Sequence, residues 1–192
     1  WSIRGYQTTI LTLSQNGRPS AYKIDESVAV RDVGWPRGGR EYELNASAVA
    51  PIVRGFYAND STILMPDITM LALLRFAILQ TEPDVVVSFI TQTNVRVLAA
   101  LHESKVPVIV CEVTDQRRID MGNWKRPRDM YYRHAAHVVA TDPVIADWLS
   151  ARGAKAISIH NPLLTPPTPI SPKQNARKRV ITMSRLSMEK RV

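Results

Sequence analysis

The chain has 192 residues, of which 45% are hydrophobic and 22% charged, and its formal net charge is +8. This composition is typical of a globular domain and excludes an intrinsically disordered chain. A single cysteine cannot close an intramolecular disulfide, so we expect a reducing compartment, the cytoplasm. Only 7% of the residues are aromatic, and they do not alternate with Lys and Arg as in a surface that stacks bases, so we expect no nucleic-acid partner. No apolar stretch approaches the roughly 20 residues that would span a bilayer.

The first third of the chain carries the weaker structural signals. Residues 6–14 predict a strand, and Gly5 before them predicts the end of a helix. Residues 27–34 predict an edge strand, because polar residues interrupt the apolar ones. Residues 35–66 contain several glycines and prolines and no sustained periodicity, so we expect a long loop with at most one short helix.

Strands and helices alternate from residue 67 to residue 160. The predicted helices are 68–82, capped by Asp67, then 93–104, capped by Thr91 or Thr93, then 124–135, and finally 143–153, capped by Asp142 and ended by Gly153. The predicted strands are 84–90, 106–113, 137–142 and 154–161. The first two are continuous apolar runs, the pattern of strands buried on both faces. Together these elements predict an α/β fold with a doubly wound, mainly parallel sheet and right-handed crossovers.

The first strand of a doubly wound sheet lies at its centre, and the sequence shows no candidate for it. We therefore expect a piece of a longer protein, cut at both ends. The unpaired seam predicts either a visible gap in the sheet or self-association with another copy of the chain.

The chain divides into three parts by composition. Residues 1–162 predict the α/β domain, and residues 163–178 predict a proline-rich linker that ends in a basic run. Residues 179–192 then begin a new strand, "VITM", which is followed by the loop "SRLSMEK".

Five blocks of this sequence, in their order and spacing, resemble family 4 glycosyltransferases. The blocks are "RGYQTTILTLS", "PDVVVSFITQTNVRVLAAL", "VPVIVCEVTD", "HAAHVVATDPVIADWL" and "ISIHNPL". The family has two Rossmann-like domains (the GT-B fold) and transfers a sugar from a nucleotide sugar. The resemblance implies the N-terminal, acceptor-side domain of a retaining enzyme. It would move a hexose or N-acetylhexosamine from a UDP- or GDP-linked donor to a glycan or lipid-linked acceptor, without a metal or other cofactor.

The end of the chain resembles the loop that opens the family's donor-binding domain. In "MSRLSMEK", Arg185 and Lys190 occupy the places of the two cations that contact the donor diphosphate. Two fixed cations would neutralise the charge that develops on a departing diphosphate. Ser184 stands where the family usually has glycine. Because the rest of the donor domain and the glycine-rich loop after the first strand are not in this sequence, we expect the fragment alone to be inactive.

Three stretches lie where strands are predicted to end, the edge at which α/β sheets bind ligands. Ser88, Thr91 and Asn94 offer hydroxyl and amide groups to an acceptor, and ordinary helix capping is the alternative. Glu112 and Asp115 are the catalytic candidates, and they match a "SERNDP" pattern of one family subgroup in part. We expect Glu112 to face the cleft between the domains and to orient the acceptor hydroxyl, with a structural pair to Arg117 as the alternative. At the third stretch, Thr141 with Asp142, capping is the stronger interpretation.

Two further features complete the prediction. The histidines have no metal-ligand spacing. Residues 117–133 combine cations with Trp and Tyr, which predicts peripheral contact with the inner face of an anionic membrane, whereas packing of the aromatics on the sheet is the alternative. The competing functional hypothesis is a non-catalytic Rossmann-like module that binds a nucleotide or another phosphorylated ligand.

Overall fold

The structure is a computed structural model that describes residues 5–13, 15, 18–20, 22–34, 46–115, 117 and 120–161. It confirms an α/β fold in which every described strand pairing is parallel. The strands are β1 (Thr8–Thr12), β2 (Val28–Asp32), β3 (Val86–Phe89), β4 (Val108–Glu112), β5 (His137–Ala140) and β6 (Ala156–Ser158). The α-helices are α1 (Ala46–Ala58), α2 (Ile68–Leu79), α3 (Thr91–Ala100), α4 (Lys125–Tyr131) and α5 (Pro143–Ser150). Short 3-10 helices cover Thr62–Asp67 (η2), Gly122–Trp124 (η3) and Tyr132–His134 (η4).

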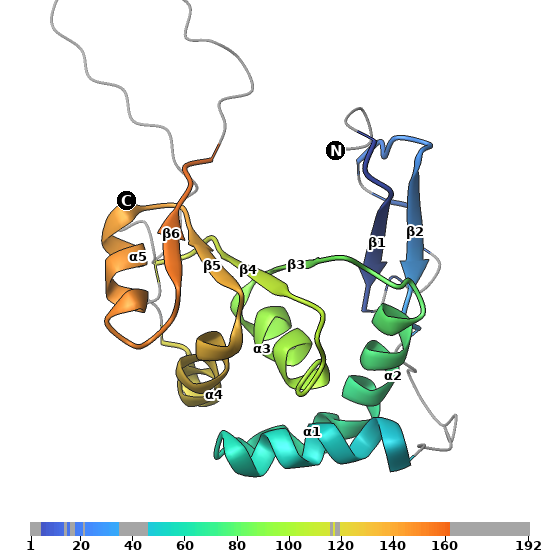
Figure 1. The fold of residues 1–192 in the computed structure, drawn as a ribbon. Coiled ribbons are helices and arrows are strands. Elements are labelled where there is room, and N and C mark those ends of the chain that lie inside the picture. The colour runs from blue at the N-terminus through green and yellow to red at the C-terminus, as the bar shows by residue number, and fades with distance from the viewer. Residues whose placement is uncertain are drawn as a thin grey trace, which may run out of the picture.

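The strands form two separate sheets rather than one. β1 pairs with β2, and β3 to β6 form a second sheet in that order. Figure 1 shows the β1–β2 pair standing apart from β3, with α2 beside it. No strand of the described ranges pairs with both β1 and β3. The expected gap at the centre of the sheet is therefore confirmed, and the order of the strands around it is the one that a Rossmann-like sheet has around its first strand.

The helices gather on one side of the β3–β6 sheet (Figure 1). Val108, Val110, Val138 and Ala140 point to that side and are buried. Along each strand, side chains alternate between the two faces. Phe89 of β3 and Ile157 of β6 point to the other side and are 54% and 44% exposed. Among the described residues, the second face of the sheet has no helix over it. The expectation that strand 84–90 is buried on both faces is thus wrong, because β3 is an edge strand with one covered face.

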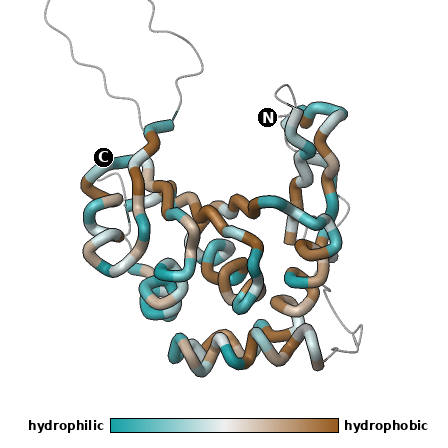
Figure 2. Tube along the Cα trace, viewed as in Figure 1, coloured by the Kyte–Doolittle hydropathy of each residue, from teal (hydrophilic) through white to brown (hydrophobic). Residues whose placement is uncertain are grey.

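The covered face and its helices share one apolar core (Figure 2). Leu71 and Leu74 of α2, Val95 and Leu98 of α3, and Leu149 of α5 all belong to it. α2 is apolar apart from Thr69 and Arg75. Together with η2 it forms one stretch, Thr62–Leu79, long and apolar enough to cross a membrane by length and composition alone. Core helices of globular proteins pass the same test, and the α2 residues named above are buried in this core.

The loop predicted for residues 35–66 is wrong for its second half. Ala46–Ala58 form the 13-residue helix α1, and η2 follows it. The sequence argues against this helix because Pro51 and Gly55 lie inside it. Gly55 has a packing reason, since a Cβ there would lie 2.8 Å from Cγ of His102. The close packing of Gly55 against His102, a residue far away in the sequence, therefore explains a glycine that local helix propensity disfavours.

The predicted helix caps have mixed outcomes. Asp142 accepts a hydrogen bond of 2.8 Å from the Val144 N–H, and Gly153 ends the helix with a φ of 89°, so both predictions are confirmed. Asp67 does not cap α2, and instead its carboxylate pairs with Arg96 at 3.0 Å. Helix α3 begins at Thr91 without a side-chain cap. The linker 163–178 and the strand at 179–192 lie outside the described residues.

Candidate functional site

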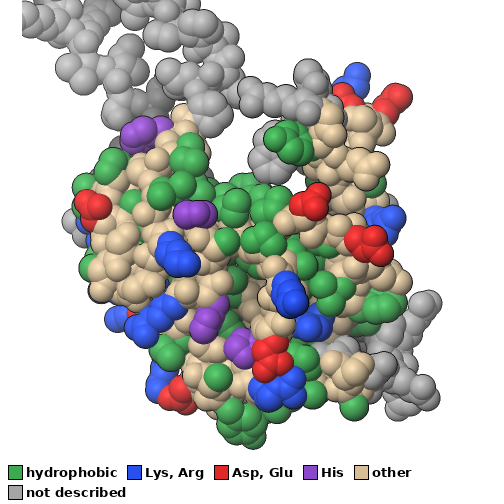
Figure 3. Space-filling view, viewed as in Figure 1, with side chains coloured by type: hydrophobic (Ala, Val, Ile, Leu, Met, Phe, Trp, Pro, Cys, Tyr) green, Lys and Arg blue, Asp and Glu red, His purple; other side chains and the backbone are tan. Residues whose placement is uncertain are grey.

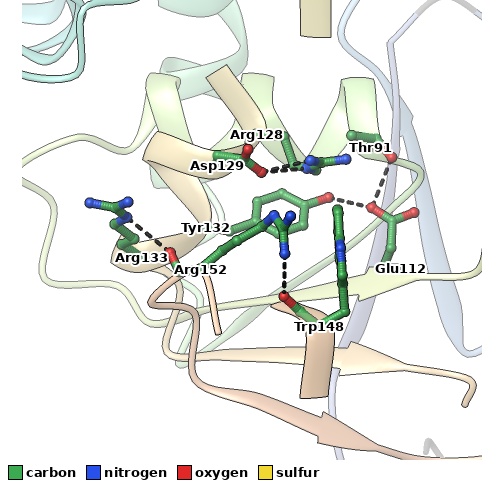
Figure 4. Close-up of polar contacts among 8 residues, drawn as sticks. All are labelled: Thr91, Glu112, Arg128, Asp129, Tyr132, Arg133, Trp148 and Arg152. Carbon is green, nitrogen blue, oxygen red and sulfur yellow. Dashed lines mark hydrogen bonds and ion pairs between the residues drawn. The ribbon is translucent and has the colours of Figure 1, made fainter. Parts of the chain in front are cut away.

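Ser88, Thr91, Asn94 and Glu112 meet in one buried hydrogen-bond network that Tyr132 completes. Ser88 Oγ donates to Asn94 Oδ1 at 2.6 Å, and Asn94 Nδ2 donates to Tyr132 Oη at 3.1 Å. Tyr132 Oη and Thr91 Oγ1 both donate to Glu112 Oε2, at 2.7 and 2.8 Å. Figure 4 shows the two hydroxyl groups pointing at the same carboxyl oxygen. Predicted residues from β3, α3 and β4 therefore converge, as expected of neighbouring strand ends.

This network faces inward rather than towards a cleft. Glu112 is 1% exposed, and Ser88, Thr91 and Asn94 are 5%, 3% and 0% exposed. The expectation that Glu112 faces the cleft is wrong, because its position in β4 points to the covered face of the sheet. The proposed pair with Arg117 is also wrong, since Arg117 binds Asp115. Capping does not explain Thr91 or Asn94 either, because the Thr91 side chain binds Glu112 of β4 and the Asn94 side chain binds the Cys111 carbonyl and Tyr132.

Asp115 and Arg117 form the exposed part of this edge. Arg117 Nε donates to Asp115 Oδ1 and its Nη2 to Oδ2, both at 2.8 Å, so the pair is bidentate. The Asp115 side chain is 21% exposed and that of Arg117 is 36% exposed. The hydrogen bonds that Arg117 donates to Asp115, and then the charges of Asp115 and Asp142, raise the pKa of Arg117 above its ordinary value. Asp115, which follows β4, therefore binds the Arg117 guanidinium directly, whereas Asp142, which follows β5, acts on it only through its charge.

His160 joins this edge, although no motif in the sequence singles it out. Its Nδ1 lies 3.0 Å from the Thr141 carbonyl oxygen, which can only accept, so Nδ1 carries the proton. In a neutral ring the exposed Nε2 is then an acceptor. The signal that could have found it is position, since His160 follows β6 as Asp115 follows β4.

The turn from β3 into α3 has an unusual backbone. Ile90 has a φ of 72°, in a region that β-branched residues rarely adopt, and it is 62% exposed. Phe89 beside it is 54% exposed. Figure 3 shows apolar side chains in the hollow between the two sheets. The edge therefore combines a polar rim at β4 to β6 with an apolar, strained turn at β3.

The basic stretch 117–133 packs most of its aromatic residues. Tyr131 and Tyr132 are 0% and 1% exposed, and Trp124 lies under the Arg96 guanidinium at 4.7 Å. Even Arg128 is buried, between Asp129 and the face of Trp148 (Figure 4). Lys125 and Arg126 are the exposed cations of α4. Packing on the sheet thus accounts for the tyrosines, and membrane contact stays a prediction.

The predicted diphosphate-binding residues Arg185 and Lys190 lie outside the described residues. Within the described ranges, no group of three or more His, Cys, Asp or Glu side chains could hold a metal ion. A shallow cavity of about 300 Å³ opens near the start of β4, between the end of α3 and His134, away from the carboxyl edge.

Comparison with known proteins gives no identification. No family model matches this chain, and no curated protein matches it either.

Proposed function

We propose that this chain is the acceptor-side part of a retaining glycosyltransferase that uses a nucleotide sugar. The observation that carries the proposal is the strand order around the central gap, with polar groups from β4, β5 and β6 at one carboxyl edge. This edge is where an α/β half-domain meets its ligand. The loop "MSRLSMEK" adds the two cations, Arg185 and Lys190, that the donor diphosphate requires.

Burial changes which of the predicted residues can contact the acceptor substrate. Glu112, Ser88, Thr91 and Asn94 support the edge from inside, since their side chains are buried. Asp115 is the carboxylate that can reach a sugar hydroxyl, and Arg117 holds it in place through two hydrogen bonds. A fixed carboxylate that accepts a hydrogen bond from the acceptor hydroxyl orients the attacking oxygen. The acceptor, a glycan or a lipid-linked sugar, stays a proposal, as does a hexose or N-acetylhexosamine donor.

The donor part is tested by calorimetric titration of UDP and GDP into the full-length protein that the resemblance predicts. We expect binding of one nucleotide, and its loss in the double variant Arg185→Ala/Lys190→Ala. The matched control is Arg177→Ala/Lys178→Ala, which removes the same charge from the linker. Loss in the control as well would mean that general charge attraction, not a site, binds the nucleotide. No binding to the unaltered protein contradicts the donor assignment.

The acceptor part is tested by transfer of labelled sugar. Asp115→Asn should reduce the transfer rate at limiting acceptor by about tenfold to a hundredfold and leave nucleotide binding unchanged, because the side chain belongs to the acceptor half. Nucleotide binding without transfer to any glycan or lipid-linked acceptor would favour the alternative, a non-catalytic module that binds a nucleotide or another phosphorylated ligand.

A further inference from the structure

Two histidines lie at the contact between helix α1 and the rest of the fold. His102 follows α3, and its ring packs so closely on Gly55 of α1 that a Cβ there would lie 2.8 Å from the His102 Cγ. The rings of His102 and His134 meet edge to face, with their centroids 6.0 Å apart. Both side chains line the cavity of about 300 Å³ near the start of β4. The contact of α1 therefore includes two groups that titrate near neutral pH.

The bond that His134 makes to the end of α1 does not depend on its charge. Its Nε2 lies 2.8 Å from Oδ1 of Asn59, the residue that follows the helix. Asn59 Nδ2 donates to the Gly55 carbonyl at 3.0 Å, so Oδ1 is the atom that faces the ring, and it can only accept. Nε2 of His134 therefore carries a proton in the neutral ring as well as in the charged one. Protonation of His134 leaves this bond in place.

His102 has no such bond to support a charge. Neither of its ring nitrogens has a hydrogen-bond partner among the described residues. Glu103, the acid next to it in the chain, is bound by Arg54 of α1, whose Nε donates to Oε1 at 2.9 Å and whose Nη2 donates to Oε2 at 2.6 Å. The His102 side chain is half-buried. A proton on this ring would therefore cost hydration without gaining a hydrogen bond to a carboxylate.

The charges around His102 also oppose its protonation. Arg54 faces it from α1, His134 faces it from η4, and Arg75 of α2 donates to the His102 carbonyl at 3.0 Å. Burial lowers the pKa of His102 below its ordinary value, the charge of Glu103 opposes this effect, and the three cations add to it. The segment that leads into β4 adds two apolar side chains to the cavity wall, Val106 and Val108.

We propose that His102 is a pH sensor for the docking of α1, which packs on α3 while the ring is neutral and is released when the ring is protonated. The charged ring cannot turn away from the helix, because the Gly55 backbone lies against the root of the side chain. Helix α1 is the element that can yield, since it lies on the far side of α3 from the β3–β6 sheet (Figure 1). Its release would expose Ile52 and Phe56, which are both 0% exposed when it is docked.

The direction of the pKa shift sets the pH window. A histidine in a released, hydrated segment has a pKa of about 6.5. Because the docked state binds the proton of His102 less tightly, the released state takes up a proton first as the pH falls. Docking is therefore fully stabilised above pH about 6.5, and this stabilisation is lost as the pH falls from there through the lower pKa of the docked state.

Amide hydrogen exchange of the 192-residue chain, measured by NMR at about pH 7.5 and about pH 5.5, tests the proposal on both sides of that window. After correction for the intrinsic exchange rates, we expect the protection of the α1 amides to fall by at least about threefold at the lower pH. The Asn59 N–H, which donates to the Gly55 carbonyl at 3.0 Å, reports on the end of the helix. At the lower pH the α1 amides should also be less protected than those of β4, because α1 opens without the sheet.

His102→Gln should lose this fall in protection, because glutamine cannot gain the charge. The matched control is His137→Gln, which removes an exposed histidine at the start of β5 and should keep the fall. An equal fall in His102→Gln overturns the proposal, and so does constant α1 protection in the unaltered chain. Equal protection of the α1 and β4 amides at the lower pH also overturns it, since the whole chain then opens together.

A titration of the unaltered chain keeps the proposal testable where His102→Gln does not fold. The ring proton Hε1 of His102, followed by NMR, should titrate below the pKa of a free histidine, about 6.5. The loss of α1 protection should follow the same titration. A His102 ring that titrates at or above the value of free histidine overturns the proposal, because its protonation would then strengthen the docking of α1 or leave it unchanged.

Discussion

Tyr132 donates a hydrogen bond of 2.7 Å to Glu112, and both residues are 1% exposed. The bond ties η4, which follows the basic helix α4, to the last residue of β4. Thr91 binds the same carboxyl oxygen from the first turn of α3. One buried acid therefore fixes the relative positions of the three elements that surround the carboxyl edge, and it does so without facing that edge itself.

Tyr132→Phe should destabilise the fold by about 1–3 kcal/mol, because it leaves a buried acceptor with one partner fewer and deprives Asn94 of an acceptor. Urea denaturation measures the change. The matched control is Tyr131→Phe, which removes a hydroxyl that accepts from Ser61 at 3.0 Å and so should cost about 0.5–1.5 kcal/mol. Equal losses in the two variants would contradict a special role for the Glu112 network.

The stability of the chain should fall above pH about 10, where tyrosine ionises in an unfolded chain. Burial raises the pKa of Tyr132, and the charge of Glu112 adds to the effect. Burial also raises the pKa of Tyr131. A raised folded-state pKa means that the unfolded chain releases the proton first, so the stabilisation is complete below pH about 10 and is lost as the pH rises further. Absorbance at 295 nm should show that Tyr131 and Tyr132 resist titration until the chain unfolds. Six tyrosines that titrate together in the folded state would contradict this.

Gly55→Ala should destabilise the fold by about 1–3 kcal/mol, although alanine is the better helix former by about 1 kcal/mol. The new Cβ would lie 2.8 Å from Cγ and 3.1 Å from Cβ of His102, atoms at the root of that side chain that cannot swing away. The control is the same substitution in a His102→Ala background. There the clash is gone, and Gly55→Ala should become neutral or stabilising. An equal cost in both backgrounds, in a double-mutant cycle, would refute the contact as the cause.

The parts of the fold that the sequence predicts are those that depend on local signals. The strands from β3 onward follow from β-branched apolar runs, and the Asp142 cap follows from its position before Pro143. Helix α1 could not be predicted in this way. Gly55 looks like a helix breaker until His102 is seen to pack on it, and those two residues are 47 positions apart.

The candidate site shows the same limit. The sequence places Ser88, Thr91 and Glu112 near one edge, and they do meet there. It cannot tell which way they point, because the alternation of a strand defines two faces without saying which one the helices will cover. The helices of the described ranges lie on the side of the β3–β6 sheet to which Glu112 points (Figure 1), so the prediction that its carboxylate faces the cleft is wrong.

Hydrogen exchange in β3 gives the last prediction, because only one edge of this strand is paired. The Val86 N–H donates to the Pro107 carbonyl at 3.0 Å, so the N–H groups of Val86 and Ser88 point to β4. Those of Val87 and Phe89 alternate with them and point to the gap. We expect the Val87 and Phe89 amides to exchange at least about tenfold faster than the Val86 and Ser88 amides, and NMR measures each of them separately.

The same measurement tests whether copies of the chain associate through the gap. Without such association the backbone at the gap stays unpaired, so the Val87 and Phe89 amides should stay fast at every protein concentration. Pairing through the gap would give these amides a partner and slow them as the concentration rises. Uniform protection of all four β3 amides in dilute protein would contradict the open gap itself, since a strand would then have to lie between β1 and β3.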